Sequence, residues 1–181
     1  MKKLISILGS TGSIGISTLK IIDKKKNYLK PYFFSADKNY LLICKQIQIY
    51  KPKIFLINNK KVFEKVKKKF RSNKIQIINK LDIKTLKKIS DITVVAIPGI
   101  AGLSPTLTMI KKSKKILIAN KESIICGWSL INNYSSRYNT KLIPVDSEHF
   151  SIFKLLENIK LNEIEKIYLT ASGGPFLNYK K

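Results

Sequence analysis

Three short motifs in this sequence have the residue types and spacing of a nucleotide- and metal-binding site. The first is GSTGSIG, in which Gly9, Gly12 and Gly15 recur between hydroxyl residues. Glycine permits a tight turn and a close approach of the backbone to a pyrophosphate, and N–H groups at a helix start attract the anion. The intervening side chains could add hydroxyl donors: Ser10, Thr11 and Ser13. The alternative is a glycine-rich turn used only for close packing. The motif lies between an apolar run and a helical segment, however, and this context favours dinucleotide binding.

The second motif is ADKN, which follows another apolar run at the position where an adenosine ribose would lie. Asp37 could accept a hydrogen bond from a ribose 2′-hydroxyl, as in NAD enzymes, whereas Lys38 and Asn39 could hold the 2′-phosphate of NADP. A carboxylate repels a phosphate, but Asp37 can rotate toward solvent while the charge of Lys38 stays available. The motif therefore favours NADP.

The third motif is DSEH, in which Asp146 and Glu148 flank Ser147. If strand geometry continues through it, residues two apart point the same way and both carboxylates could face one hard divalent cation. Alternatively, Asp146 or Ser147 caps a following helix and Glu148 lies in its first turn. Position alone leaves both interpretations open. His149 is the only histidine, so the sequence offers no histidine-based metal cluster.

A polar cluster, Asn120, Lys121 and Glu122, follows the apolar run KILIA. Lys121 could neutralise an anionic substrate or an enolate, or it could pair with Glu122 or Glu148. We expect Trp128, farther along the same segment, to belong to the core.

These motifs are carried by apolar runs that alternate with segments of helical length. The runs are LISILG, PYFFSA, KIFLIN, KIQII, DITVVAI, KILIAN and TKLIPV. Such alternation predicts βαβ units and a Rossmann-like, doubly wound α/β fold with a mostly parallel sheet. From about Pro144 the pattern changes to an acidic cluster, a helix and a run IEKIYLTAS that predicts one more strand. We therefore expect a nucleotide-binding domain at residues 1–145 and the beginning of a second α/β domain at residues 146–181.

The formal net charge of +24 is due almost entirely to lysine, since Arg71 and Arg137 are the only arginines. Arginine is the residue that reads bases and phosphates with two hydrogen bonds, so solvated lysine faces are favoured over a specific nucleic-acid partner.

No apolar run approaches the roughly 18 residues of a membrane span, and we expect a cytoplasmic protein that does not bind membranes. Cys44 and Cys126 lie far apart, and we expect both to be buried, reduced thiols.

Four motifs in order, GSTGSIG, ANKESI, PVDSEH and ASGGPF, together resemble the 1-deoxy-D-xylulose 5-phosphate reductoisomerase family of the non-mevalonate isoprenoid pathway, and GLSPTL supports the match. The resemblance covers essentially the whole chain. It implies NADPH-dependent rearrangement and reduction of 1-deoxy-D-xylulose 5-phosphate to 2-C-methyl-D-erythritol 4-phosphate. It also implies a requirement for Mg²⁺ or Mn²⁺ and, for the full-length enzyme, a homodimer.

The resemblance also implies a set of site residues. Those expected to contact the cofactor are Thr11, Gly12, Ser13, Ile14, Lys38, Asn39, Asn120 and Glu122, with Asp37 beside them. Those expected to bind the sugar phosphate are Lys121, Ser147, Glu148 and Ser172. Asp146 and Glu148 would hold the metal ion, and Lys121 and Glu148 would act in catalysis.

This sequence departs from the family pattern in two respects. Asp37 stands where the family usually has glycine, which affects the preference for NADP over NAD. The third metal-binding carboxylate, the mobile active-site loop, the main phosphate-binding residues and a carboxy-terminal helical domain would all lie beyond Lys181. We therefore expect an amino-terminal portion of a longer enzyme, or the product of a decayed gene, that is inactive alone. The alternatives are an NADP-binding module without catalysis and a lysine-rich nucleic-acid-binding protein.

Overall fold

The computed structural model describes residues 1–72 and 74–168 of the chain. The chain divides into two units, Met1–Asp146 and a second one that begins at Ser147. The functions expected of the two units stay predictions. None of the helices in the described ranges is long and apolar enough to cross a membrane.

The strands in the described part of the first unit form one seven-stranded sheet, and every neighbouring pair in it is parallel. The strands are β1 (Lys3–Leu8), β2 (Leu29–Ala36), β3 (Ile54–Ile57), β4 (Gln76–Ile78), β5 (Ile92–Val95), β6 (Lys115–Ile118) and β7 (Lys141–Pro144). Their order across the sheet is β4-β3-β2-β1-β5-β6-β7. The predicted doubly wound α/β fold is confirmed.

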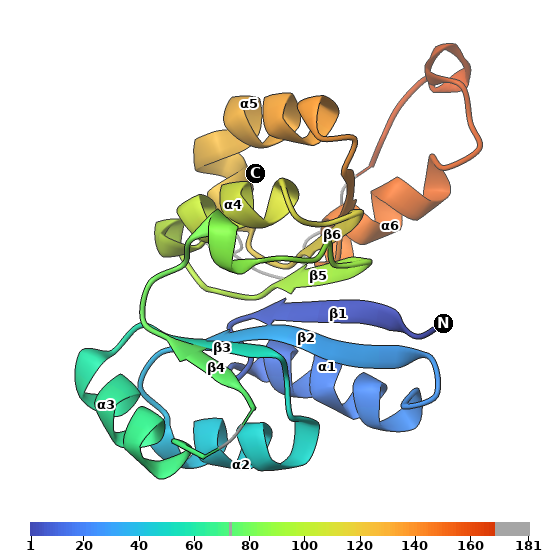
Figure 1. The fold of residues 1–181 in the computed structure, drawn as a ribbon. Coiled ribbons are helices and arrows are strands. Elements are labelled where there is room, and N and C mark those ends of the chain that lie inside the picture. Colours follow the sequence, from blue (N-terminus) through green and yellow to red (C-terminus); the bar gives the residue numbers. More distant parts are fainter. Residues whose placement is uncertain (73, 169–181) are drawn as a thin grey trace, which may run out of the picture. The chain divides into compact units, whose positions relative to one another are not determined.

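Helices cover both faces of this sheet (Figure 1). On one face lie α1 (Ser13–Lys24), α2 (Tyr40–Tyr50) and α3 (Lys60–Lys69), and on the other lie α4 (Leu103–Ile110) and α5 (Lys121–Arg137). Short 3-10 turns at Ile83–Thr85 and Ile100–Gly102 interrupt the connections that precede β5 and α4. The second unit contains α6 (Ser147–Leu155) and a 3-10 turn at Leu161–Glu163.

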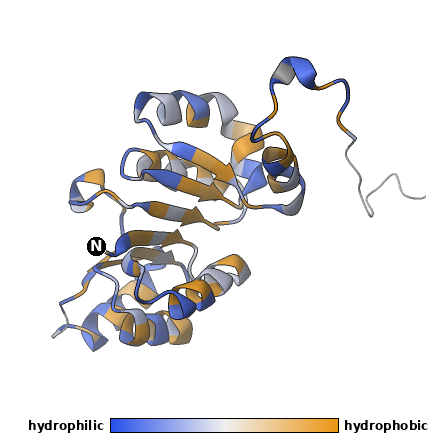
Figure 2. Ribbon diagram, turned by 90° about the vertical axis from the view of Figure 1, so that its right-hand side faces the viewer, coloured by the Kyte–Doolittle hydropathy of each residue, from blue (hydrophilic) through white to orange (hydrophobic). Residues whose placement is uncertain are grey.

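Two apolar layers form because successive strand residues point to opposite faces of the sheet. In β2, Phe34 packs into the layer under α1, α2 and α3, whereas its neighbour Phe33 packs into the layer under α4 and α5. Phe55 and Leu56 divide in the same way in β3. Both faces are thus buried, and Figure 2 shows hydrophobic residues along the strands and mixed colours on the helices. Continuous apolar runs are the expected sequence of such strands.

Three expectations about individual elements are wrong. Trp128 lies on the outer side of α5 with 52% of its surface exposed, because the buried face of this helix is formed by Ser123, Gly127 and Ile131. Cys126 is exposed as well, whereas Cys44 is buried as expected. In the second unit, residues 164–168, the described part of the expected last strand, form no strand, and Ile167 and Tyr168 are exposed.

The strand order creates a crevice between β1 and β5. From β1 the chain winds outward through β2, β3 and β4, and it then returns to place β5 on the other side of β1. The loops that follow β1 and β5 therefore leave the sheet toward opposite faces. In open parallel sheets, ligands bind at this reversal, outside the carboxyl ends of the strands.

Asp91 links three strands at the opposite, amino edge of the sheet. Its carboxylate accepts hydrogen bonds from the Leu4 backbone N–H at 2.8 Å and from Lys114 Nζ at 2.7 Å. The hydrogen bond from Lys114 is the main cause that holds the pKa of Asp91 below its usual range, although partial burial acts in the opposite direction. The pair therefore favours the charged form of Asp91 in the folded protein.

We expect Asp91→Asn to lower the free energy of unfolding at neutral pH by about 1 kcal/mol or less, because the pair is partly exposed. A lowered folded-state pKa stabilises above the unfolded pKa of about 4, and this stabilisation is lost as pH falls through the folded value. The difference between Asp91→Asn and wild type should thus vanish in acid, measured by urea unfolding across pH. Glu64→Gln, an exposed carboxylate on α3, is the control. A difference that persists unchanged in acid would contradict the ion-pair explanation.

Candidate functional site

A cavity of about 330 Å³ lies at the carboxyl ends of β1, β2 and β5, where the strand order places the crevice. Its lining includes five of the predicted cofactor residues: Thr11, Gly12, Asp37, Lys38 and Asn39. Gly9 of the predicted glycine turn lines it as well. The sequence does not single out the remaining lining residues: Ser35, Ala36, Asn58, Ala96, Ile97 and Pro98. Their only sequence signal is that they follow, or lie at the ends of, parallel strands. The structure therefore joins the first two motifs in one site.

The glycine turn follows β1 and is held against β2 and β5. Gly9 has a φ of +83°, and a Cβ atom there would lie 2.6 Å from the Ala96 carbonyl oxygen. A Cβ at Gly15 would collide with the Gly9 carbonyl oxygen. At Gly12, by contrast, φ is −79° and the nearest atom to a Cβ would be 3.5 Å away. The fold thus requires glycine at positions 9 and 15 but tolerates a methyl group at position 12.

The start of α1 differs from the starts of three other helices in the same unit. Asparagine side chains cap α2, α3 and α5, through Asn39, Asn59 and Asn120. The residue before α1 is Gly12, which has no capping side chain. The N–H groups of the first turn, at Ser13 and Ile14, thus lack a side-chain acceptor, and together with the helix dipole they favour an anion.

Ser10 does not serve as a donor to a pyrophosphate, contrary to one expectation from the sequence. It is fully buried, and its hydroxyl donates to Gln46 Oε1 at 2.6 Å. Thr11 is half-buried and Ser13 is exposed, so these two hydroxyl residues still lie at the surface of the turn.

Asn120 lies behind the cavity and is almost completely buried. Its Oδ1 accepts from the Ser123 backbone N–H at 2.8 Å, while its Nδ2 donates to the carbonyl oxygens of Gly99 at 2.8 Å and of Ile97. The side chain therefore joins the start of α5 to the loop after β5 that forms one wall of the cavity. Its predicted contact with the cofactor stays a prediction.

Lys121 and Glu122 form the first turn of α5, and both side chains are exposed. They follow β6 at the same sheet edge as the glycine turn, but they do not line the 330 Å³ cavity. A carboxylate in the first turn, such as Glu122, also stabilises the helix start through the dipole.

The argument from strand alternation at Asp146 and Glu148 is wrong. The strand β7 ends at Pro144 and α6 begins at Ser147, so strand geometry does not run through this motif. Glu148 lies in the first turn of α6, and its Oε2 accepts a hydrogen bond from Ser147 Oγ at 2.8 Å. A metal site and a helix start are thus both compatible with this segment. Within the described ranges, His, Cys, Asp and Glu side chains form no group of three or more that could hold a metal ion.

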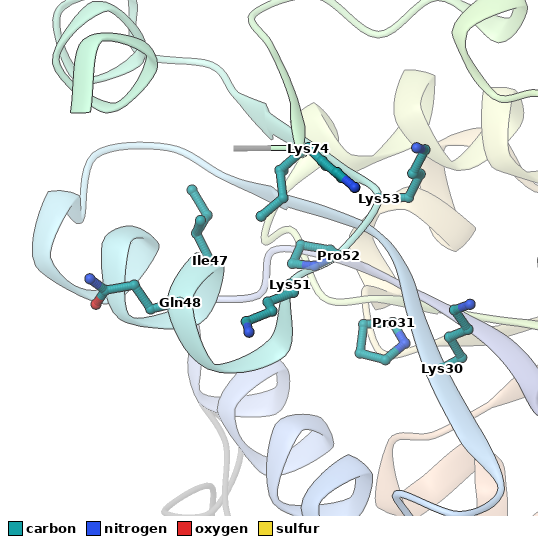
Figure 3. Close-up of a pocket in the computed structure, with 9 residues that line it drawn as sticks. Lys30, Pro31, Ile47, Gln48, Lys51, Pro52, Lys53 and Lys74 are labelled. Carbon is teal, nitrogen blue, oxygen red and sulfur yellow. The ribbon is translucent and has the colours of Figure 1, made fainter. Parts of the chain in front are cut away.

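A second hollow, of about 490 Å³, lies at the amino ends of β2, β3 and β4, opposite the site (Figure 3). Lysines from separate segments line it: Lys30, Lys51, Lys53 and Lys74. Its described lining includes neither a carboxylate nor an arginine. Such a surface attracts polyanions electrostatically, but it lacks the bidentate groups that read bases.

Sheet order, glycine turn and crevice together define a Rossmann-like, doubly wound α/β protein. Residues 5–127 match the family model of 1-deoxy-D-xylulose 5-phosphate reductoisomerase, and residues 142–181 match the model of its C-terminal domain. The chain belongs to this family. Ser172, one of the predicted substrate-binding residues, lies outside the described residues.

Individual relatives agree with this assignment. A 1-deoxy-D-xylulose 5-phosphate reductoisomerase from Pelagibacter ubique is 48% identical over 98% of this chain and 47% of its own length. A solved reductoisomerase from Zymomonas mobilis in complex with NADPH has a TM-score of 0.78 and 29% identity, covering 85% of this chain and 41% of that one. A solved reductoisomerase in complex with magnesium has a TM-score of 0.84 and 27% identity, covering 99% and 48%. The chain thus spans about half the length of these relatives.

The glycine turn offers a test that separates folding from ligand binding. Gly15→Ala should destabilise the protein strongly, because the new methyl group collides with backbone. Gly12→Ala should leave the melting temperature nearly unchanged but weaken dinucleotide binding, because the methyl group occupies space that a bound pyrophosphate needs. Thermal unfolding and fluorescence titration with NADPH would measure the two effects. Equal affinity of Gly12→Ala and wild type would show that the turn is used for packing alone.

Proposed function

We propose that this chain binds NADPH in the 330 Å³ cavity and forms the cofactor-binding part of a 1-deoxy-D-xylulose 5-phosphate reductoisomerase. The observation that carries the proposal is that one cavity brings together a glycine turn, which leads into the uncapped start of α1, and the pair Lys38 and Asn39. The first suits a pyrophosphate, and the second suits a 2′-phosphate. The solved Zymomonas mobilis relative, which is a complex with NADPH, supports the same assignment.

In this proposal the pyrophosphate lies against Thr11, Gly12, Ser13 and Ile14. The 2′-phosphate lies at the start of α2, where Lys38 supplies the positive charge. Asn39 uses its Oδ1 to cap α2 at Leu42 N, 3.1 Å away, so its Nδ2 group is the part that can donate to a phosphate. Asp37 turns toward solvent, and Asn120 and Glu122 complete the cofactor site from the start of α5.

The reaction requires a divalent metal and a sugar phosphate, and this chain supplies part of both sites. Asp146 and Glu148 are hard oxygen ligands of the kind that Mg²⁺ and Mn²⁺ prefer, so the donor set fits these ions. A metal bound there would stabilise the negative charge that develops during rearrangement. Lys121, Ser147 and Ser172 would bind the sugar phosphate, and Glu148 would serve substrate and metal. By the family resemblance we also propose a homodimer that acts in the cytoplasm.

We expect the protein to bind NADPH more tightly than NADH. Replacing Lys38 with Gln should weaken NADPH about tenfold, because a charge-assisted contact with the 2′-phosphate is lost, and should leave NADH unchanged. Fluorescence titration with both cofactors is the measurement, and Lys65→Gln, the same charge change on α3, is the control. Tighter binding of NADH than NADPH to wild type would show instead that Asp37 controls the site.

The reaction can be tested in a chimera in which residues 1–181 replace the matching segment of the Pelagibacter ubique relative. It should oxidise NADPH when 1-deoxy-D-xylulose 5-phosphate and Mn²⁺ are present. Asp146→Asn should lower the rate by about 100-fold or more without weakening NADPH, because a metal ligand is lost. Asp23→Asn, an exposed carboxylate on α1, is the matched control. A chimera that binds NADPH and turns over equally well with Asn at position 146 would refute the metal assignment.

A further inference from the structure

A pair of buried polar side chains connects the glycine turn to α2. Ser10 has 0% and Gln46 has 3% of its surface exposed. The Ser10 hydroxyl donates to Gln46 Oε1 at 2.6 Å, and Gln46 Nε2 donates to the Ser10 carbonyl oxygen at 2.9 Å. The two bonds fix the orientation of the amide, because exchanging its oxygen and nitrogen would set two carbonyl oxygens against each other. Gln46 is thus held on both sides by one residue of the turn.

The partners of this pair are themselves fixed. The backbone N–H groups of Gly9 and Ser10 donate to the Ser35 carbonyl oxygen at 3.1 and 2.8 Å, which ties the turn to the end of β2. Gln46 lies about two helical turns after Asn39, so it is on the same side of α2 as the cap. The bonds to Ser10 therefore limit both sliding and rotation of α2 relative to the glycine turn.

This connection joins the two ends of the proposed cofactor site. The turn is the pyrophosphate side, and Lys38 and Asn39 at the start of α2 are the 2′-phosphate side. A dinucleotide can contact the turn and the start of α2 at the same time only if the spacing between these two segments is fixed. NADH lacks the 2′-phosphate, so its binding depends on the turn but much less on where α2 begins.

We infer that Gln46 is a positioning residue for cofactor selectivity: its paired bonds to Ser10 set the spacing between the pyrophosphate turn and the 2′-phosphate end of α2. The inference rests on the proposed NADPH site. Gln46 touches neither phosphate in this account and acts only through the placement of Ser10, Lys38 and Asn39. Breaking the pair should therefore reduce affinity for NADPH more than affinity for NADH.

Two single variants and their combination test the inference. Gln46→Met keeps the length and the unbranched shape of the side chain but removes both bonds, whereas Ser10→Ala removes only the hydroxyl bond. In both, the ratio of the NADH to the NADPH dissociation constant should fall, by about five- to tenfold for Gln46→Met. In the double variant neither the Ser10 hydroxyl nor the Gln46 amide is left without its side-chain partner, and only the Ser10 carbonyl oxygen still lacks its donor. Its stability should therefore partly recover while its selectivity stays low. A residue that only stabilises the fold would not separate stability from selectivity in this way.

The matched control is Thr93→Val, which removes another buried hydroxyl pair, Thr93 Oγ1 to Ser113 Oγ at 2.7 Å, near the amino edge of the sheet. It should lower the melting temperature without changing the cofactor ratio. An unchanged ratio in Gln46→Met, or an equal fall in Thr93→Val, would overturn the inference while leaving the proposed function intact. Wild-type protein that binds neither cofactor would instead overturn the proposed function, and the inference with it.

Discussion

The contact between the glycine turn and the Ala96 carbonyl is the constraint on which the site depends. It lies where β1 and β5 separate, and it is possible only because Gly9 adopts a positive φ and carries no side chain. The same approach lets Gly15 pack against the Gly9 carbonyl, which directs α1 away from the end of β1. Such a crevice forms in a parallel sheet whose strand order reverses at β1. Because the turn beside it consists largely of glycine, its backbone can approach a ligand closely.

Buried polar groups, rather than the apolar layers, fix the walls of the cavity. Ser35 holds the turn through its carbonyl and its hydroxyl, which accepts from Gly9 N at 3.1 Å. Asn120 holds the loop after β5 from the other side. Apolar contacts alone would leave such loops free to shift, because dispersion has little directionality, whereas satisfied buried hydrogen bonds specify one arrangement. The site is thus preorganised from behind by residues that need not touch a ligand.

The fold was predictable because its strands are buried on both faces. Continuous apolar runs such as LISILG and KIFLIN are typical of parallel strands buried on both faces. The seven runs named in the sequence all form strands of one sheet. The first two motifs met as predicted, because the carboxyl ends of parallel strands share one edge. The individual roles of the site residues follow from the family resemblance and not from the alternation of strands and helices.

What failed in the sequence interpretation concerned side-chain direction. Residue type places Trp128 and Cys126 in the core, but their exposure depends on which side of α5 faces the sheet, and Ser123, Gly127 and Ile131 already fill that side. The alternation argument at Asp146 failed because a helix begins one residue later. Gln46 gave no signal, since a lone glutamine in a helix is ordinarily solvated, and its role depends on a contact between segments 36 residues apart.

Charge alone cannot make this protein selective among anions. A formal net charge of +24 attracts phosphates in general, and the hollow opposite the site adds four lysines from separate segments. Such attraction speeds encounter and is screened by salt, but it contributes similarly to NADPH and to other polyanions. Discrimination must therefore come from groups held at fixed separations. In this chain the side chains that hold the turn, α2 and the loop after β5 are uncharged and buried: Ser10, Gln46 and Asn120. Salt does not screen their hydrogen bonds, so the separation of the ligand-binding groups can be selective although the charge of the surface is not.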